Sequence, residues 1–421
     1  MQDMAPPRVS LKAFLSTAKT ALSAPPAQRP NPLTFVVGNE SADLDSLCSA
    51  VLLAYFRTHT PPHTLHIPLS NLPRADLTLR PELTAVLRPA GLKPDDLVTL
   101  SDLPSDGLNP ENTRWFLVDH NAPTSGLADE LLLAGTTVIG CVDHHDDEGK
   151  VPHDNTNGEP RIIEKSGSCM SLVVDHCKEA WEKLSADHAT EENINQQHDA
   201  ELARLALGPI LMDTRNLTSK DKTTDWDVQA AAFAEGKLAN ADKGYDRTAF
   251  FDEITRLKEG ISGMSYRDLF RKDYKQWTDT DSNDSDGGRL TLGVSAIVQG
   301  FDYLLSETGD TTQLVAELKK WAREQRLDIA AVMTVSRPED VFTRELLVWA
   351  FGERAVRVAK RFASENGERL GLESWAGGAL DQVDDDDEGE WRVCWTQRRV
   401  ENSRKQVAPL LREAMKGSSK L

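Results

Sequence analysis

Short apolar runs alternate with helical patterns from Leu33 to about Glu235, and this alternation limits the fold more than any other feature. Such runs are typical of buried strands, and strands that alternate with helices form a mostly parallel sheet covered on both faces. The predicted strands are Leu33–Gly38, Thr64–Leu69, Trp115–Asp119 and Thr137–Asp143, and the predicted helices are Leu44–Arg57, Ser168–Leu184, Asp199–Met212 and Trp226–Phe233. We therefore expect an α/β domain here.

A second, smaller domain is expected in the rest of the chain, because 421 residues are too many for one core. The segment Glu235–Arg247 contains Gly and Lys residues and is predicted to be a linker. After it we predict the helix Ala249–Gly260, the strands Thr291–Val298, Ile329–Val335, Glu345–Ala350 and Trp391–Thr396, and a last helix Ser403–Met415. The expected division is an N-terminal extension (residues 1–30), a mostly parallel domain (31–240) and a mixed α/β domain (248–421).

The composition argues against several classes of protein. No stretch approaches the roughly 18 uninterrupted apolar residues of a membrane span. Five scattered cysteines without a CxxC pair fit a reducing compartment. A net charge of -19 disfavours a nucleic-acid-binding protein, although metals and local cations can still hold an anionic substrate. We expect a cytoplasmic monomer with no membrane or nucleic-acid partner.

Two kinds of segment are expected to lie outside any functional site. The acidic runs Thr278–Asp286 and Asp384–Glu390 are predicted to be solvated loops, because consecutive carboxylates repel one another and need water. The amphipathic segment Val9–Leu22 resembles a transit peptide, which makes the mitochondrial matrix the alternative compartment. We instead predict a helix there that packs on the first domain.

Acidic residues gather at the ends of the predicted strands. They are Asp43 and Asp45 after the first strand, Asp119 at the end of another, Asp143 with His144 and His145 at the end of a further one, and Asp213 after a helical apolar run. Groups just past the carboxyl ends of parallel strands converge on one crevice. Several carboxylates there repel one another unless they share cations, and imidazoles beside them are accepted as ligands by magnesium, manganese and zinc.

A metal site explains this pattern better than local structure does. A single Asp after a strand is most often a helix cap or a turn residue. Three strand-terminal acidic motifs in one domain, one of them DHH, are poorly explained by capping. Two metals about 3.5–4 Å apart could lower the pKa of a bridging water and clamp both ends of a phosphoryl displacement. The sequence therefore favours a metal-dependent phosphoanhydride hydrolase.

Five ordered motifs resemble those of the DHH phosphoesterases. They are GNESADLDS (Gly38–Ser46), VDHN (Val118–Asn121), VDHH (Val142–His145), MDT (Met212–Thr214) and, for the associated DHHA2 domain, ENSRKQVAP (Glu401–Pro409). Together they cover most of the chain, from about residue 30 to 415. Within the family, the first motif, RKDYK (Arg271–Lys275) and GSCMSLV (Gly167–Val173) are similar to eukaryotic exopolyphosphatases and prune-like proteins.

The resemblance implies an active site in the cleft between the two domains and a role for each motif residue. The metal ligands would be Asp43, Asp45, Asp119, His144 and Asp213, with Asp45 or Asp119 bridging the ions. The catalytic set would be Asp119, His144 and His145, with His145 facing a phosphate oxygen. His120 and Asp143 would orient the ligands. Phosphate contacts are assigned to Arg404 and Lys405 at the start of the last helix, to Lys272 and Lys275, to His145, and to Ser168 at the start of a helix.

One position departs from the pattern of the family II pyrophosphatases, which carry a His where this chain has Asn39. As a metal ligand, the amide oxygen of Asn39 would be weaker and neutral, which should favour magnesium over manganese. This difference also argues against a dedicated pyrophosphatase.

The function implied by the resemblance is hydrolysis of terminal orthophosphate from linear inorganic polyphosphate. Two or more divalent ions would take part, with magnesium expected and manganese or cobalt as alternatives. A prune-like hydrolase of short polyphosphates or cyclic nucleotides and a family II type inorganic pyrophosphatase remain alternative enzymes. A non-catalytic scaffold on the same fold is the alternative from another class.

Overall fold

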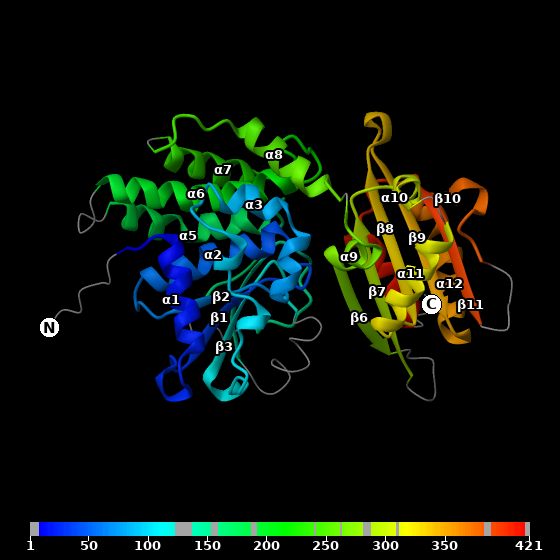
Figure 1. Ribbon diagram of the computed structural model, residues 1–421, viewed down its shortest axis with the longest axis horizontal. Coiled ribbons are helices and arrows are strands. Elements are labelled where there is room, and N and C mark those ends of the chain that lie inside the picture. The colour runs from blue at the N-terminus through cyan, green and yellow to red at the C-terminus, as the bar shows by residue number, and fades with distance from the viewer. Residues whose placement is uncertain are drawn as a thin grey trace. The chain divides into compact units, whose positions relative to one another are not determined.

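The computed structural model describes residues 8–122, 137–152, 159–186, 192–239, 241–261, 263–280, 288–308, 311–382 and 389–416. The chain forms two compact units, Met1–Gly260 and Ile261–Leu421 (Figure 1). Among the described residues, no helix combines the length and apolar character needed to cross a membrane.

The first unit contains a five-stranded sheet in the order β2-β1-β3-β4-β5, and every neighbouring pair is parallel. The strands are β1 (Leu33–Val37), β2 (His66–Leu69), β3 (Thr113–Val118), β4 (Thr137–Asp143) and β5 (Arg161–Ile163). The prediction of a mostly parallel sheet is confirmed. The short edge strand β5 was not predicted, because its three residues are only half-buried and give no apolar run.

Both faces of this sheet are buried, which explains the uninterrupted apolar runs. Along β3, Phe116 joins one hydrophobic cluster and Trp115 joins another on the opposite face. The helices are α1 (Leu11–Ser23), α2 (Leu44–His59), α3 (Glu82–Leu87), α5 (Cys169–Ser185), α6 (Glu192–Thr214), α7 (Asp225–Leu238) and α8 (Arg247–Glu259). Phe14 and Leu15 of α1 are buried in the core of this unit. The prediction of a packed N-terminal helix is confirmed.

The division between the units lies after the segment expected to be a linker. Helix α7 extends to Leu238 and α8 begins at Arg247, within the predicted linker Glu235–Arg247. Helix α8 belongs to the first unit because Phe250 and Ile254 are buried in its core. The boundary therefore falls between Gly260 and Ile261.

The second unit contains a six-stranded mixed sheet in the order β10-β11-β9-β8-β7-β6. Only β7 and β8 pair in parallel. The strands are β6 (Tyr274–Thr280), β7 (Arg289–Ile297), β8 (Ile329–Ser336), β9 (Thr343–Phe351), β10 (Leu372–Ser374) and β11 (Glu390–Gln397). The prediction of a mixed α/β fold for this part of the chain is confirmed.

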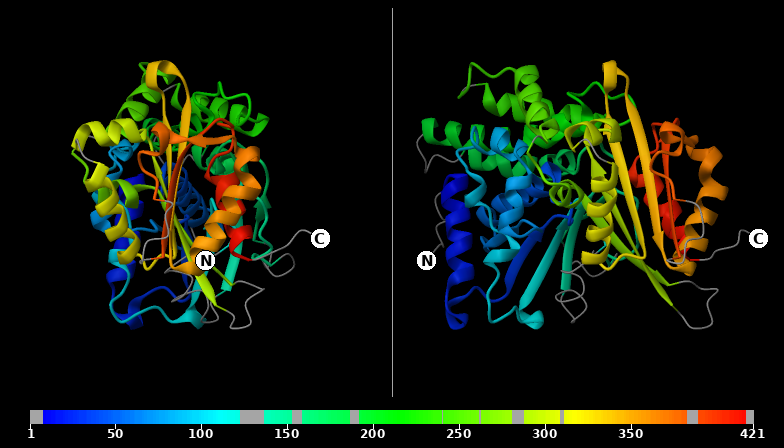
Figure 2. Two further views of the ribbon diagram at one scale, coloured as in Figure 1. Left: turned by 90° about the vertical axis from the view of Figure 1, so that its right-hand side faces the viewer. Right: turned by 45° about the vertical axis from the view of Figure 1, so that its right-hand side comes forward.

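Helices cover both faces of the second sheet. Those on one face are α9 (Tyr266–Lys272), α10 (Phe301–Thr308) and α11 (Thr311–Glu324), and those on the other are α12 (Glu353–Leu370) and α13 (Arg404–Met415). In the left view of Figure 2, α11 (yellow) and the pair α12 and α13 (orange and red) lie on opposite sides of the strands.

The predicted loop at Thr278–Asp286 is wrong at its beginning, because Thr278–Thr280 belong to β6. The buried Asp279 carboxylate accepts a hydrogen bond of 2.7 Å from Arg412, so it does not need water as a solvated loop would. Residues 281–286 lie outside the described residues. In the second acidic run, Glu390 begins β11 and residues 384–388 lie outside the described residues.

Candidate metal centre

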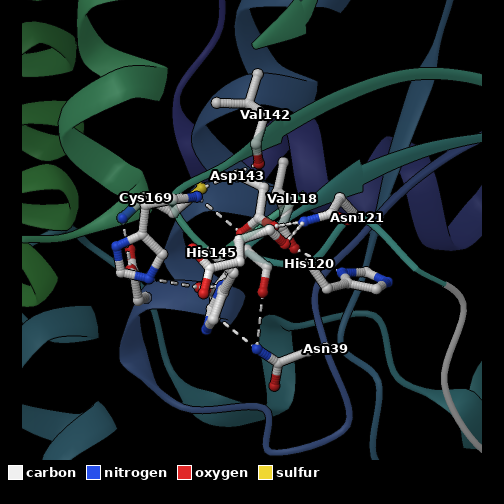
Figure 3. Close-up of polar contacts among 12 residues, drawn as sticks. Asn39, Val118, His120, Asn121, Val142, Asp143, His145 and Cys169 are labelled. Atoms are coloured by element: carbon white, nitrogen blue, oxygen red, sulfur yellow. Dashed lines mark hydrogen bonds and ion pairs between the residues drawn. The ribbon is translucent and has the colours of Figure 1, made fainter. Parts of the chain in front are cut away.

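Three neighbouring strands of the first sheet bring the acidic motifs together. The order β1-β3-β4 is parallel, so the segments that follow these strands lie at the same edge of the sheet. These segments carry Asn39 to Ser46, Asp119 to Asn121, and His144 with His145. Figure 3 shows the labelled side chains from all three segments gathered around one point.

Asp119, His144 and His145 form a group that could hold a metal ion, with one ligand atom from each lying within 4.8 Å of the others. Nε2 of His144 lies 3.2 Å from Oδ1 of Asp119 and 3.9 Å from Oδ2 of Asp45. The side chains of Asp45, Asp119 and His144 are at least nine-tenths buried. Two carboxylate oxygens and one imidazole nitrogen therefore face one another in a site with little water.

The other nitrogen of His144 fixes which ring atom can bind a metal. Nδ1 lies 3.0 Å from the backbone oxygen of Ser166. A carbonyl oxygen only accepts, so Nδ1 carries a proton and Nε2 is the ring atom that faces the two carboxylates. A proton on Nε2 or a bound cation can pair with these carboxylate oxygens. This is the arrangement in which a metal-bound histidine donates its second N–H to a carbonyl.

Asp43 and Asp45 indicate an excess of negative charge at the same place. Burial, Asp119 and Asp213 together raise the pKa of Asp43 to about 6, and the charge of Lys258 and the backbone N–H of Ser46 offset only part of this. The pKa of Asp45 lies well above its usual range, first because of burial and then because of Asp119 and Asp213. A divalent cation would relieve this repulsion. The donor set, carboxylates and one imidazole, fits magnesium, manganese or cobalt.

Asp45 is held at the N-terminus of α5. Its Oδ1 accepts hydrogen bonds from Oγ of Ser168 (2.8 Å) and the N–H of Met170 (2.9 Å), and its Oδ2 accepts one from the N–H of Cys169 (2.7 Å). Because Oδ2 accepts one of these three bonds and lies toward His144, it is the oxygen placed to bind a cation.

Ser168 does not lie where a substrate could reach it. Its residue is fully buried, its hydroxyl donates to Asp45, and its N–H donates to Oδ1 of Asp227 at 3.2 Å. The N–H of Gly167 donates to the other oxygen of Asp227 at 2.9 Å. The carboxylate of Asp227 thus takes the place that the sequence analysis gave to phosphate, because α7 brings it against this turn.

Asn39 holds a ligand and does not present its oxygen to the cluster. Its Oδ1 accepts the N–H of Ser41 at 2.9 Å, which turns the amide nitrogen toward Asp119. That nitrogen donates to Oδ2 (2.8 Å) and to the backbone oxygen (3.0 Å) of Asp119. Figure 3 shows Asn39 reaching the cluster through this nitrogen. The geometry favours a role in holding Asp119 over the metal-ligand role expected from the sequence.

Asp143 orients His145. It is fully buried, and its Oδ1 lies 2.8 Å from Nδ1 of His145. Burial acts to raise the pKa of Asp143, but the hydrogen bond and charge of His145 outweigh it and hold the pKa below its usual range. Asn121 donates to Oδ2 of Asp143 at 2.6 Å. Nδ1 of His120 contacts the backbone oxygen of Val118 at 2.8 Å, and Figure 3 shows the His120 ring pointing away from His145.

The predicted phosphate-binding cations lie in the second unit. Arg404 donates to the backbone oxygen of Asp273 (3.1 Å) and forms an ion pair with its carboxylate (2.7 Å). This contact joins the start of α13 to the turn between Lys272, which ends α9 and is buried, and Lys275, which is half-buried on β6. Lys405 lies in the first turn of α13, where Ser403 caps the helix.

Several residues that hold the site had no predicted role. Among them, Ser46 holds Asp119, Asn121 holds Asp143, Ser166 holds His144, and Asp227 holds the turn at residues 167–168. Ser46 and Asn121 lie within the recognised motifs, which is the only signal that could have indicated them. Ser166 acts through its backbone, and Asp227 lies 60 residues from the turn it holds.

Comparisons with known proteins agree with this geometry. Residues 34–209 match the DHH family, N-terminal domain, and residues 252–414 match the DHHA2 domain. The chain is 32% identical over 409 residues to a "Putative exopolyphosphatase" from Schizosaccharomyces pombe, which covers 97% of this chain and 96% of that protein. It is 26% identical to exopolyphosphatase PRUNE1 of Rattus norvegicus, over 77% of this chain and 63% of that protein.

A solved structure shares the fold. The crystal structure of a "putative family II inorganic pyrophosphatase" from Methanococcus jannaschii matches with a TM-score of 0.55 and 19% identity, covering 91% of this chain and 99% of that one. The expected resemblance is thus confirmed by two domain matches in order, a relative matched along nearly its whole length, and a shared fold. The chain belongs to the DHH family, among the members that pair a DHH domain with a DHHA2 domain.

Proposed function

We propose that this protein is an exopolyphosphatase that removes terminal orthophosphate from linear inorganic polyphosphate. The observation that carries the proposal is the buried group formed by Nε2 of His144, Oδ1 of Asp119 (3.2 Å) and Oδ2 of Asp45 (3.9 Å), because carboxylates and an imidazole placed together are a donor set for a divalent cation. The names of the relatives support the substrate, since the Schizosaccharomyces pombe protein and PRUNE1 are both named exopolyphosphatases.

The proposed metal ligands are Asp43, Asp45, Asp119, His144 and Asp213, and magnesium is the expected ion, with two or more bound. A relative from Methanocaldococcus jannaschii, 24% identical, is named a manganese-dependent inorganic pyrophosphatase, which supports a divalent metal. When bound, such ions activate water and neutralise charge on the transferred phosphoryl group. The chain supplies anionic ligands, and burial followed by the charges of neighbouring carboxylates raises the pKa values of Asp43 and Asp45.

His145 is proposed to contact the substrate, and His144 to lie inside the metal centre. The His145 side chain is 25% exposed, whereas that of His144 is 6% exposed. The Nδ1–H of His145 donates to Asp143, which fixes the orientation of the ring, and we propose that the ring contacts a phosphate oxygen. Arg404 and Lys405, and with less support Lys272 and Lys275, are proposed to bind phosphate groups of the polyanion.

The test compares phosphate release from long-chain polyphosphate and from pyrophosphate, with magnesium and with EDTA, in the wild type and in Asp119→Ala. We expect fast, magnesium-dependent release from polyphosphate, little from pyrophosphate, and a loss of turnover by about 10² or more in the variant. Near-normal turnover in Asp119→Ala would contradict the metal centre.

A family II type pyrophosphatase is the second candidate, because the chain shares its fold with such an enzyme. A preference for pyrophosphate in the same assay would favour it and keep the metal centre. Release from neither substrate would favour a prune-like hydrolase, to be tested on short polyphosphates and cyclic AMP, or a scaffold.

A further inference from the structure

Ser46 makes one of the shortest contacts in the metal centre and has no role in the function proposed above. Its hydroxyl donates to Oδ2 of Asp119 at 2.6 Å, and both residues are at least 97% buried. A hydroxyl hydrogen bond to a carboxylate at this distance is charge-assisted, which makes it about twice as strong as a neutral one. The amide nitrogen of Asn39 donates to the same oxygen at 2.8 Å.

The two oxygens of Asp119 therefore differ. Oδ2 accepts two hydrogen bonds from the segment after β1, whereas Oδ1 lies 3.2 Å from Nε2 of His144 and 3.8 Å from Nδ1 of His145. Rotation of the carboxylate would break both bonds to Oδ2. Oδ1 is consequently the oxygen that is presented to a cation.

The backbone is arranged to keep this contact. Asp119 has a positive φ of 59°, and its N–H donates to the backbone oxygen of Val142 at 3.0 Å. A Cβ atom at Gly38 would lie 2.6 Å from Cβ of Ser46 and 2.9 Å from its backbone oxygen. Only glycine at the end of β1 lets the first turn of α2 approach so closely, and this approach brings the Ser46 hydroxyl to Asp119.

We propose that Ser46 is a positioning residue of the metal centre, whose hydroxyl fixes Oδ2 of Asp119 so that Oδ1 alone is directed at the metal. This inference rests on the proposed function, since it takes Asp119 to be a metal ligand. Without the hydroxyl, Oδ2 loses its 2.6 Å hydrogen bond, and the carboxylate is held less firmly. The cation then has to order its own ligand, which weakens binding.

The experiment measures metal affinity in the full-length Ser46→Ala variant. Calorimetric titration with Mn²⁺ should give a dissociation constant about 10- to 100-fold higher than in the wild type. The Co²⁺ absorption spectrum, which reports ligand number and geometry, should change as well. The matched control is Thr58→Val, which removes a hydroxyl from the same helix where it donates to the backbone oxygen of Ala54 at 2.8 Å. The control should keep the wild-type affinity and spectrum.

The outcomes separate the inference from the function. A wild type that binds no divalent metal overturns the metal centre, and the role of Ser46 with it. A wild type that binds metal and a Ser46→Ala variant that binds it within twofold, with an unchanged Co²⁺ spectrum, overturns the role of Ser46 alone. Equal losses of affinity in Ser46→Ala and Thr58→Val would also overturn it, because they would show a general loss of helix packing.

Discussion

The carboxyl groups of the metal centre oppose one another in the metal-free protein. The charges of Asp119 and Asp213 both raise the pKa of Asp43, and they do the same to Asp45. The donors around Asp45 and Asp119 fix the geometry of these side chains but do not remove the repulsion. The residues that prepare the site for a cation are therefore a source of instability without it.

Asp43 gives this instability a measurable pH dependence. Its pKa is about 6 in the folded protein against an ordinary value of 3.8, so between these pH values the folded state keeps a proton that the unfolded state releases. Stability from this group is lost as the pH rises through that window. Asp43→Asn should thus be close to the wild type at pH 4 and more stable at pH 8, by on the order of 1–3 kcal/mol.

Urea unfolding of both metal-free proteins at the two pH values measures the difference. Titrating groups that do not interact with Asp43, such as the buried His66 with its lowered pKa, contribute equally to both proteins and cancel. Asp45, whose pKa is raised in part by Asp43, adds to the difference. If the free energy of unfolding of Asp43→Asn at pH 8 equals that of the wild type, the ionised Asp43 does not destabilise the metal-free protein. Saturating magnesium should remove the advantage of the variant, since only the wild type retains the ligand.

Among the elements, the sequence predicts best those that are buried on both faces. The predictions for β1, β2, β3 and β4 agree with the structure to within two residues, because each of these strands is a continuous apolar run. The edge strands β5, β6 and β10 were not predicted. β5 and β10 have three residues each and none is buried, and in β6 only Asp279 is buried. Most of the acidic residues directly follow the strands that are buried on both faces, so the prediction of a parallel sheet also predicted that they gather at its carboxyl edge.

The sequence could not predict which polar groups would pair inside the site. Ser168 was expected to contact a phosphate group. Instead, the N–H groups of Gly167 and Ser168 donate to the carboxylate of Asp227 on helix α7. Asn39 was expected to offer its oxygen to a metal, but that oxygen accepts a hydrogen bond from the N–H of Ser41. Which polar groups pair depends on tertiary contacts and on which of several donors lies closest, and a local sequence pattern does not predict either.

Helix α13 provides a matched pair of arginines to test phosphate binding. Arg404 at its start and Arg412 near its end each form an ion pair of 2.7 Å with a carboxylate of the second unit, Asp273 and Asp279. Only Arg404 lies at the helix N-terminus, where the helix dipole also favours phosphate. Arg404→Ala should raise KM for polyphosphate about tenfold or more, as expected for loss of a charge-assisted hydrogen bond.

Arg412→Ala should lower the thermal stability more than Arg404→Ala, because it removes the closest partner of the buried Asp279 carboxylate, but it should leave KM within about twofold. Metal affinity should not change in either variant. Equal rises in KM for the two would mean that the ion pairs with the sheet, and not phosphate contact at the helix start, explain the loss in Arg404→Ala. Steady-state assays across a range of polyphosphate concentrations make the comparison.

At the scale of the whole molecule, the two units have separate cores. The hydrophobic clusters of the first unit contain residues up to Leu257, and those of the second begin at Ile261. All the proposed metal ligands belong to the first unit, whereas Arg404, Lys405, Lys272 and Lys275 belong to the second. Metal binding and phosphate binding are thus assigned to parts of the chain that have independent hydrophobic support.

Residues 1–260 expressed alone should therefore fold and bind metal, but should hydrolyse polyphosphate poorly. A unit with its own core and its own sheet is expected to unfold cooperatively. Its Mn²⁺ affinity should lie within about threefold of the full-length value, since every proposed ligand and the donors Asn39 and Ser46 are retained. Turnover should fall by about 10² or more without the second unit's cations. Circular dichroism melts, calorimetry and phosphate release measure the three properties. A cooperatively folded fragment that no longer binds Mn²⁺ would mean that the second unit completes the metal centre itself, and the assignment of ligands to the first unit alone would have to be abandoned.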